Sequence, residues 1–181
     1  HLVEPGTLNE VPDGTMGELV VRGPCVLHGY YRADEKNRES FSDGFLRTGD
    51  LMLRKIVGGR LFYLFQGRIK DIVKRAGETI SCEEIERVLR AGPGIADVAV
   101  VPVSDPVYIE RACACLILQP GTPPPTVTTL NQYLATTGLA KFKWPEHVHV
   151  FDVFPTTKSG KLSKPLLRQE SEARIIAASK R

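Results

Sequence analysis

The pattern of apolar residues changes near residue 67 of this 181-residue chain. Before the change, residues 18–22, 50–56 and 60–66 read as β-strands. Gly58-Gly59 separates the last two strands, and such a pair is typical of a two-residue hairpin turn. The sequence therefore predicts a first part that consists mostly of β-strands.

A short helix is predicted inside this β-rich part. Asp34 is a favoured residue type at the start of a helix, and we expect it to cap one that runs to Phe41. Asp43-Gly44 is then expected to end the helix with a turn.

Helix and strand patterns alternate in the rest of the chain. Ser81 and Glu84 have the spacing of a capping box at the start of a helix. The predicted elements are a helix over 82–91, strands over 95–103 and 111–119, a helix over 127–137, a strand over 147–151 and a last helix opened by Pro165. The fold class is therefore α+β, with a β-rich part over 1–67 followed by a small mixed α/β domain over 68–181.

The composition is that of an ordinary globular protein, with 42% hydrophobic and 25% charged residues. The net charge of +3 is small and both signs are interleaved, so no nucleic acid partner is indicated. No apolar run reaches the roughly 20 residues of a membrane helix, so no membrane span is expected. The four cysteines show no framework spacing, which favours free thiols in a cytoplasmic protein.

The first candidate motif is GFLRTGDL, residues 44–51. Most Thr-Gly-Asp triplets are turns that the Asp side chain stabilises by bonding the backbone. Alternatively, Asp50 is held rigidly and its two carboxylate oxygens accept hydrogen bonds from both hydroxyls of a ribose. The triplet alone does not separate these interpretations.

The second motif is GRIKDIVKRAGE, residues 67–78, and a basic surface strand is its ordinary interpretation. In the functional interpretation, Arg68 offers a fixed fork of donors to nucleotide oxygens, and Lys74 and Arg75 lie further along the same segment. Ala76-Gly77-Glu78 would then form a turn that lets the backbone approach a ligand.

The third motif is PTTKSGKLSK, residues 155–164. A Ser-Gly turn with lysines is usually only an exposed loop. However, a lysine on such a loop is a compact point charge, which a reaction between a carboxylate and a phosphate requires. Lys161 lies at the centre of this loop.

Two pairs have metal-ligand residue types, Cys113-x-Cys115 and His147-x-His149. Each pair lies in a strand-like run and would point to one face of its strand. Structural zinc sites normally use tight turns with two to four residues between the cysteines, so packing roles are favoured over a metal site.

Together and in this order, the motifs resemble the later motifs of the adenylate-forming superfamily, which includes acyl- and aryl-CoA synthetases, firefly luciferase and peptide-synthetase adenylation domains. The resemblance covers nearly the whole chain and is closest to aryl-acid AMP ligases and acyl-CoA ligases. The matching segments are GELVVRGPCVLHGYY (17–31), GFLRTGDL, GRIKDIVKRAGETISCEEIE (67–86) and PTTKSGKLSK.

The resemblance implies that 1–67 is the last β-rich subdomain of a large AMP-binding domain and that 68–181 is the mobile C-terminal lid domain. The family's phosphate-binding loop, acid pocket and Mg²⁺ ligand would belong to a missing N-terminal domain, the first expected partner. The chain begins at His1 in strand-like sequence, which suggests a piece cut from something longer. Alone, it is expected to be inactive.

The family reaction makes an acyl-adenylate and pyrophosphate from a carboxylic acid and MgATP, and a thiol then displaces AMP. By resemblance, Lys161 is catalytic in the first step, Asp50 and Arg68 bind the nucleotide, and Lys70 is the hinge. Domain rotation about the hinge would bring the segment Lys74, Arg75, Ala76, Gly77 and Glu78 to the nucleotide for thiol transfer.

The resemblance is compatible with three functions. The first is the C-terminal fragment of an acyl- or aryl-acid CoA ligase, and the second is an aryl-acid AMP ligase that loads the phosphopantetheine of a carrier protein. The third is a non-catalytic binding module derived from the lid. It predicts that the reactive residues have been replaced, whereas this chain contains them. Ala76 and Ile109 stand where many relatives have glycine, which puts the backbone geometry near Glu110 and Arg111 in question.

Overall fold

The computed structural model describes residues 1–179, and it divides into two compact units. The first is His1–Lys70 and the second begins at Asp71. Each unit has its own five-stranded sheet. The predicted α+β class is confirmed.

The first unit is an antiparallel sheet with the strand order β1-β2-β4-β3, in which β5 also pairs with β4. Its strands are β1 Leu2–Val3, β2 Met16–Val21, β3 Phe41–Ser42, β4 Phe45–Val57 and β5 Arg60–Arg68. The three predicted strands are therefore confirmed; β4 and β5 are longer than predicted, and β2 begins two residues earlier and ends one residue earlier. The two short strands escaped prediction because two residues carry no pattern.

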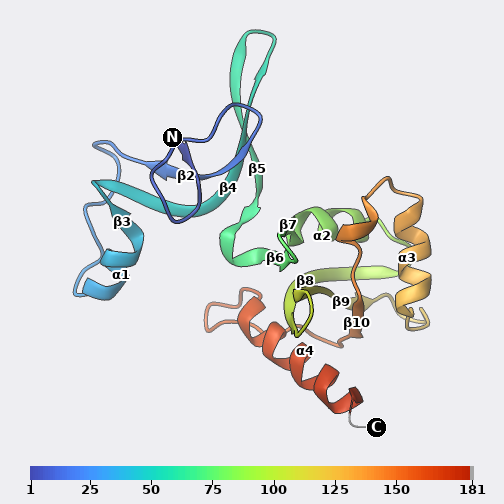
Figure 1. The fold of residues 1–181 in the computed structure, drawn as a ribbon. Helices are drawn as coiled ribbons and strands as arrows, with labels where there is room; N and C mark the ends of the chain where they lie inside the picture. Colours follow the sequence, from blue (N-terminus) through green and yellow to red (C-terminus); the bar gives the residue numbers. More distant parts are fainter. Residues whose placement is uncertain (180–181) are drawn as a thin grey trace. The chain divides into compact units, whose positions relative to one another are not determined.

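The hairpin of β4 and β5 is the longest feature of this unit (Figure 1). Val57 pairs with Arg60, so Gly58 and Gly59 form a two-residue turn, as predicted. Both glycines have positive φ, 57° and 76°, which the turn that matches the strand twist requires.

The short helix α1 spans Asp34–Ser40, and the predicted cap is wrong. Ala33 is the N-cap, and Asp34 lies in the first turn, where its carboxylate favours the positive end of the helix dipole. The helix ends one residue before the predicted Phe41. Asp43 and Gly44 form a turn, both with positive φ, but the turn joins β3 to β4 and does not end the helix as predicted.

The second unit has a sheet with the order β10-β9-β6-β7, in which β8 pairs with β9. Its pairs are antiparallel except that of β10 with β9, which is parallel. The elements are β6 Ile72–Arg75, β7 Glu78–Ser81, α2 Cys82–Arg90, β8 Ile95–Asp105, β9 Ile109–Leu118, α3 Val127–Ala135, β10 His147–Val150 and α4 Lys164–Ser179, with 3-10 turns at Ile69–Asp71, where the two units join, and Lys141–Lys143.

Side-chain caps start two of these helices. The Ser81 hydroxyl accepts a hydrogen bond from the Glu84 backbone N–H at 3.3 Å, so the predicted cap of α2 is confirmed. Thr126 and Thr129 form a reciprocal capping box on α3, which the sequence analysis did not identify. Helix α3 ends at Ala135, two residues before the predicted end.

Helices cover both faces of the second sheet (Figure 1). Alternate residues of β8 enter two cores: Val98 and Val100 pack toward α2 and α3, whereas Val101 and Val103 pack toward α4. A strand that is buried on both faces is apolar along its length, which explains the run IADVAVVPV. Leu167 of α4 belongs to the second core, so the helix that follows the loop of Lys161 is packed against the sheet.

Candidate functional site

Asp50 lies at a β-bulge in β4, where the pairing with β2 shifts register. The predicted turn at Asp50 is wrong, because strand β4 continues through Thr48 and Gly49 to Val57. Gly49 has φ 72°, the left-handed conformation that such a bulge needs. The Thr48 hydroxyl accepts a hydrogen bond from the Asp50 N–H at 3.1 Å and donates one to the Leu19 carbonyl at 2.8 Å.

A buried carboxylate holds this bulge in place. Glu18 is only 3% exposed, and it accepts a hydrogen bond from the Gly49 N–H at 3.3 Å. Its other oxygen pairs with Arg47, whose guanidinium also donates to the Thr7 carbonyl at 3.1 Å. Glu18 was not predicted from the sequence, although a charged residue within the apolar run of β2 was a signal.

Arg68 faces Asp50 across the hairpin, since the two residues are direct partners in β4 and β5. Arg68 Nε lies 3.1 Å from Asp50 Oδ1, and the Arg68 side chain is mostly exposed. Asp50 Oδ1 is buried and has no hydrogen-bond partner within the described chain. Because its contact with Arg68 lacks hydrogen-bond geometry, this rigidly held oxygen can still accept a hydrogen bond from a ligand hydroxyl.

A cavity of about 430 Å³ opens in the first unit beside Arg68. Arg68 lines it together with Lys70, Thr48 and Gly49. Lys70 is exposed in the 3-10 turn Ile69–Asp71, the last residue of the first unit. Arg68 thus contacts Asp50 and lines the same cavity as Lys70, whereas Asp50 is not among the residues that line it.

The predicted thiol-transfer segment is a tight hairpin in the second unit. Arg75 pairs with Glu78, and Ala76 and Gly77 form the turn with φ 46° and 94°. Lys74 is exposed, while its backbone N–H donates to the Glu110 carboxylate at 2.9 Å. The expected turn is present, and it is bonded to the neighbouring loop through Ala76 N–H and the Tyr108 carbonyl at 3.1 Å.

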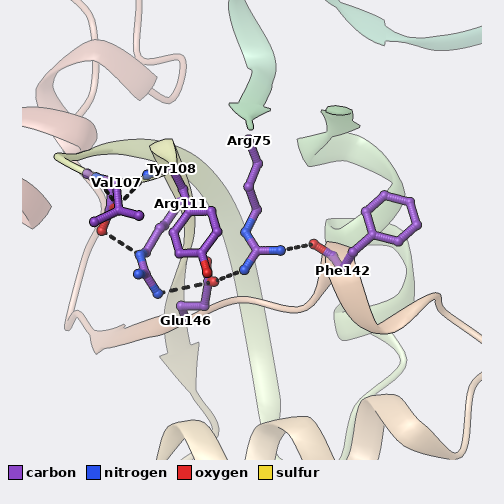
Figure 2. Close-up of polar contacts among 7 residues, drawn as sticks. Arg75, Val107, Tyr108, Arg111, Phe142 and Glu146 are labelled. Atoms are coloured by element: carbon purple, nitrogen blue, oxygen red, sulfur yellow. Dashed lines mark hydrogen bonds and ion pairs between the residues drawn. The ribbon is translucent and has the colours of Figure 1, made fainter. Parts of the chain in front are cut away.

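Two arginines enclose the ring of Tyr108 beside this hairpin (Figure 2). The guanidinium carbons of Arg75 and Arg111 each lie 4.7 Å from the ring centre. Both arginines bind the Glu146 carboxylate, with Arg111 Nη1 at 3.2 Å from Oε1. Arg75 is thereby committed to contacts within the unit, whereas Lys74 remains exposed.

Asp105 also binds Arg111, with Arg111 Nε 2.5 Å from Asp105 Oδ2. Backbone N–H donors of Tyr108 and Val107, together with Arg111, lower the pKa of the Asp105 carboxyl. Hydrogen bonds to the charged form favour ionisation. The ionised Asp105 carboxylate therefore binds the backbone of the loop that contains Val107 and Tyr108.

Ile109 has φ 72° and Ala76 has φ 46°, both in the left-handed region. The backbone at these two positions therefore has the conformation that glycine favours, although neither residue is glycine. This conformation is sterically unfavourable for Ile109, because a β-branched residue with positive φ is a genuine outlier. Ile109 is 64% exposed and its register partners are Arg75 and Asp105.

The loop of Lys161 is a small closed turn. Thr157 N–H donates to the Lys161 carbonyl at 2.7 Å, and the Lys161 N–H donates back to the Thr157 hydroxyl at 3.3 Å. Lys158 and Lys161 are both exposed. The structure thus places Lys161 on a formed loop of the second unit.

Lys164, at the end of the same motif, is in a different environment. Its ammonium lies 2.8 Å from Glu86 Oε1 and 3.5 Å from Asp71 Oδ2. Burial alone would lower the pKa of Lys164, but the two carboxylates raise it above its ordinary value. Lys164 is therefore bound inside the unit as a cation.

The Cys and His pairs lie side by side on β9 and β10, with His147 opposite Cys113 and His149 opposite Cys115. Cys113 Sγ and His149 Nδ1 are 3.8 Å apart, and Cys115 Sγ contacts the Ser171 hydroxyl at 3.3 Å. Among residues 1–179 no group of three potential ligands is arranged to hold a metal ion. No helix in that range is long and apolar enough to cross a membrane.

Comparison with known proteins gives a consistent result. The family model of the AMP-binding enzyme C-terminal domain matches residues 84–161. The chain is 42% identical over 168 residues to a salicylyl-CoA synthase / salicylate adenylyltransferase of Streptomyces sp, with 92% of this chain and 30% of that protein covered. It is 38% identical over 155 residues to a salicyl-AMP ligase / salicyl-S-ArCP synthetase of Mycobacterium tuberculosis, with 85% and 26% covered.

Solved structures agree with these relatives. The crystal structure of ATP-bound MatB from Rhodopseudomonas palustris superimposes with a TM-score of 0.79 and 34% sequence identity. It covers 94% of this chain, and the chain covers 33% of MatB. The chain thus spans about a third of the length of the proteins that it matches.

Proposed function

Because this chain belongs to the adenylate-forming superfamily and is a C-terminal part of such an enzyme, we propose that the whole protein joins an aryl acid to a pantetheine thiol through an acyl-adenylate. The aryl class is supported by the relatives, whose names specify salicylate. Their names also specify both CoA and a carrier protein as acceptor. Both acceptors present the same phosphopantetheine thiol.

The observation that carries this proposal is the setting of Asp50. A carboxylate oxygen is held by the bulge, beside the guanidinium of Arg68, and has no hydrogen-bond partner within the described chain. A vicinal diol would satisfy this carboxylate, and Arg68 would add donors for the ribose or phosphate oxygens. Asp50 and Arg68 would thereby keep the adenylate in place through both steps.

Lys161 would act in the first step. The attack of a carboxylate on the α-phosphate brings two anions together, and a positioned cation lowers that barrier. Lys161 lies on an exposed loop, whereas Lys164 is bound by Glu86 and Asp71. In the reaction, the carboxylate oxygen forms the bond to phosphorus and pyrophosphate leaves.

The second step would use the other surface of the C-terminal domain. We propose that residues 68–181 form this lid, that 1–67 end the large AMP-binding domain, and that Lys70 is the hinge between them. Lys74 on the hairpin of β6 and β7 would face the adenylate after rotation. The thiol sulfur then bonds to the acyl carbon, and AMP leaves.

The remaining requirements would be supplied outside this chain. The acid pocket, the phosphate-binding loop and the Mg²⁺ ligand are proposed for the N-terminal domain of the whole protein. Mg²⁺ would neutralise charge on the ATP phosphates there. The residues of this chain would bind the nucleotide and provide the lysine.

The test is acid-dependent exchange of pyrophosphate into ATP by the whole protein. Salicylate, 2,3-dihydroxybenzoate, benzoate and a straight-chain fatty acid are compared as substrates. We expect exchange with at least one aryl acid and little with the fatty acid. Subsequent addition of CoA or of a holo carrier protein identifies the acceptor. No exchange with any acid would contradict the proposal and favour a non-catalytic binding module.

A further inference from the structure

The loop that carries Lys161 has little contact with the rest of its unit. Residues 156–162 are all exposed, and the bonds of the turn are local ones between Thr157, Gly160 and Lys161. Such bonds give the turn its shape but do not fix its position. Its position therefore depends on how the two ends of the loop are held.

The C-terminal end of the loop is held by an ion pair of low exposure. Lys164 is the first residue of α4, three positions after Lys161, and its side chain is 19% exposed. Its partner Glu86 on α2 is 5% exposed and also accepts a hydrogen bond from the Val100 N–H at 2.7 Å. Burial raises the pKa of Glu86, and the Lys164 ammonium and the Val100 N–H oppose that rise. The carboxylate and ammonium thus stabilise each other in their charged forms.

The same ammonium reaches the beginning of the second unit. Lys164 Nζ lies 3.5 Å from Oδ2 of Asp71, the residue that follows Lys70 in the chain. One side chain therefore connects the end of the Lys161 loop with the first residue after the proposed hinge. The next turn of α4 adds a second connection, because Arg168 Nη2 lies 3.1 Å from Glu110, which also binds the Lys74 N–H.

We propose that Lys164 is a positioning residue for Lys161. Its ion pairs with Glu86 and Asp71 fix the end of the loop to the segment that follows Lys70. The loop and that segment then move as one body when the hinge turns. The expected effect on adenylation rests on the proposed function, whereas the expected effect on the mobility of the loop does not.

The test uses the whole protein with Lys164→Met, which keeps most of the length of the side chain and removes the ammonium. Trypsin cleavage after Lys158 and Lys161 reports the mobility of the loop without any activity measurement. We expect cleavage to be at least about threefold faster in the variant, since the anchored end can open locally. Lys164→Arg should restore the wild-type rate.

Kinetics of the two half-reactions separate positioning from folding. Lys164→Met should lower kcat for adenylation by about 10- to 100-fold with little change in KM for ATP, because the lysine is misplaced while the nucleotide site is intact. Thioester formation from presynthesised acyl-adenylate should remain within about twofold of wild type, because misplacing Lys161 affects only the first step. Lys143→Met is the matched control, since Lys143 also pairs with a glutamate of α2, Glu84, at 2.7 Å.

Wild-type trypsin cleavage in Lys164→Met would overturn the anchoring role. Equal losses in both half-reactions, or an equal effect of Lys143→Met, would overturn the positioning role, because both point to general loss of structure. If the wild-type protein adenylates no acid, the proposed function fails, and the trypsin comparison alone decides whether Lys164 anchors the loop.

Discussion

Asp50 and Arg68 face each other across the β4–β5 hairpin, with Arg68 Nε 3.1 Å from Asp50 Oδ1. This arrangement leaves a buried carboxylate oxygen without a hydrogen bond among residues 1–179. If a ribose occupies the site, Asp50→Ala removes a charged acceptor from its hydroxyls. The whole protein should then bind ATP and AMP more weakly by about 1.5–3 kcal/mol in calorimetry.

Asp13→Ala is the control for this measurement. Asp13 also pairs with an arginine of the same sheet, but its partner is Arg54 and not Arg68. It should leave nucleotide affinity unchanged. Unchanged affinity in Asp50→Ala as well would remove Asp50 from the nucleotide site.

Ile109 offers a test of backbone strain. A non-glycine residue in a sparsely populated backbone region costs about 1–3 kcal/mol. Ile109 has φ 72° and is mostly exposed, so glycine would relieve this cost and lose little packing. Glycine itself costs about 0.5–1 kcal/mol in chain entropy. Ile109→Gly should therefore raise the free energy of unfolding by about 1 kcal/mol in denaturant titrations.

Val107→Gly is the matched control, because Val107 is also β-branched and exposed but is not among the residues with positive φ. That change should lower stability, since glycine adds chain entropy to the unfolded state without relieving strain. A destabilised Ile109→Gly variant would show that the side chain contributes more than the strain costs.

The Asp105 carboxyl predicts a dependence of stability on acid. Its folded-state pKa is lowered below 3.8 by backbone donors and by Arg111. A lowered pKa gives stability that is present above the unfolded value and is lost as the pH falls through the folded value. Asp105→Asn should therefore be less stable than wild type at neutral pH.

The difference in unfolding midpoint between Asp105→Asn and wild type should shrink as the pH falls through the lowered folded-state pKa of Asp105, because the wild-type carboxyl then becomes protonated. Urea titrations of both proteins at several pH values between neutral and acid measure this difference. A gap that stays constant with pH would show that ionised Asp105 contributes nothing to the fold.

Local patterns in the sequence predicted most of the elements. The run of β8 and the hairpin at Gly58-Gly59 were recognised because apolar periodicity and turn residues act over a few positions. The start of α1 was misplaced by one residue because Asp34 suits both the cap and the first turn.

The contacts that set up the candidate site were not predictable in this way. Glu18 meets Arg47, and Lys164 meets Glu86, only after distant segments have packed together. A single sequence contains no local signal for such pairs. The resemblance supplied Asp50, Arg68 and Lys161, but the side chains that hold them became visible only in the structure.

The most direct test of this account is Lys161→Ala in the whole protein, measured in both half-reactions. Lys161 is exposed on its loop, so the variant should fold normally. Adenylation should fall by about 10²- to 10³-fold, the usual loss of one electrostatic donor, while Lys158→Ala has little effect. Thioester formation from presynthesised acyl-adenylate should stay near the wild-type rate. Equal losses in both half-reactions, or no loss in either, would contradict the role of Lys161 as the cation of the first step.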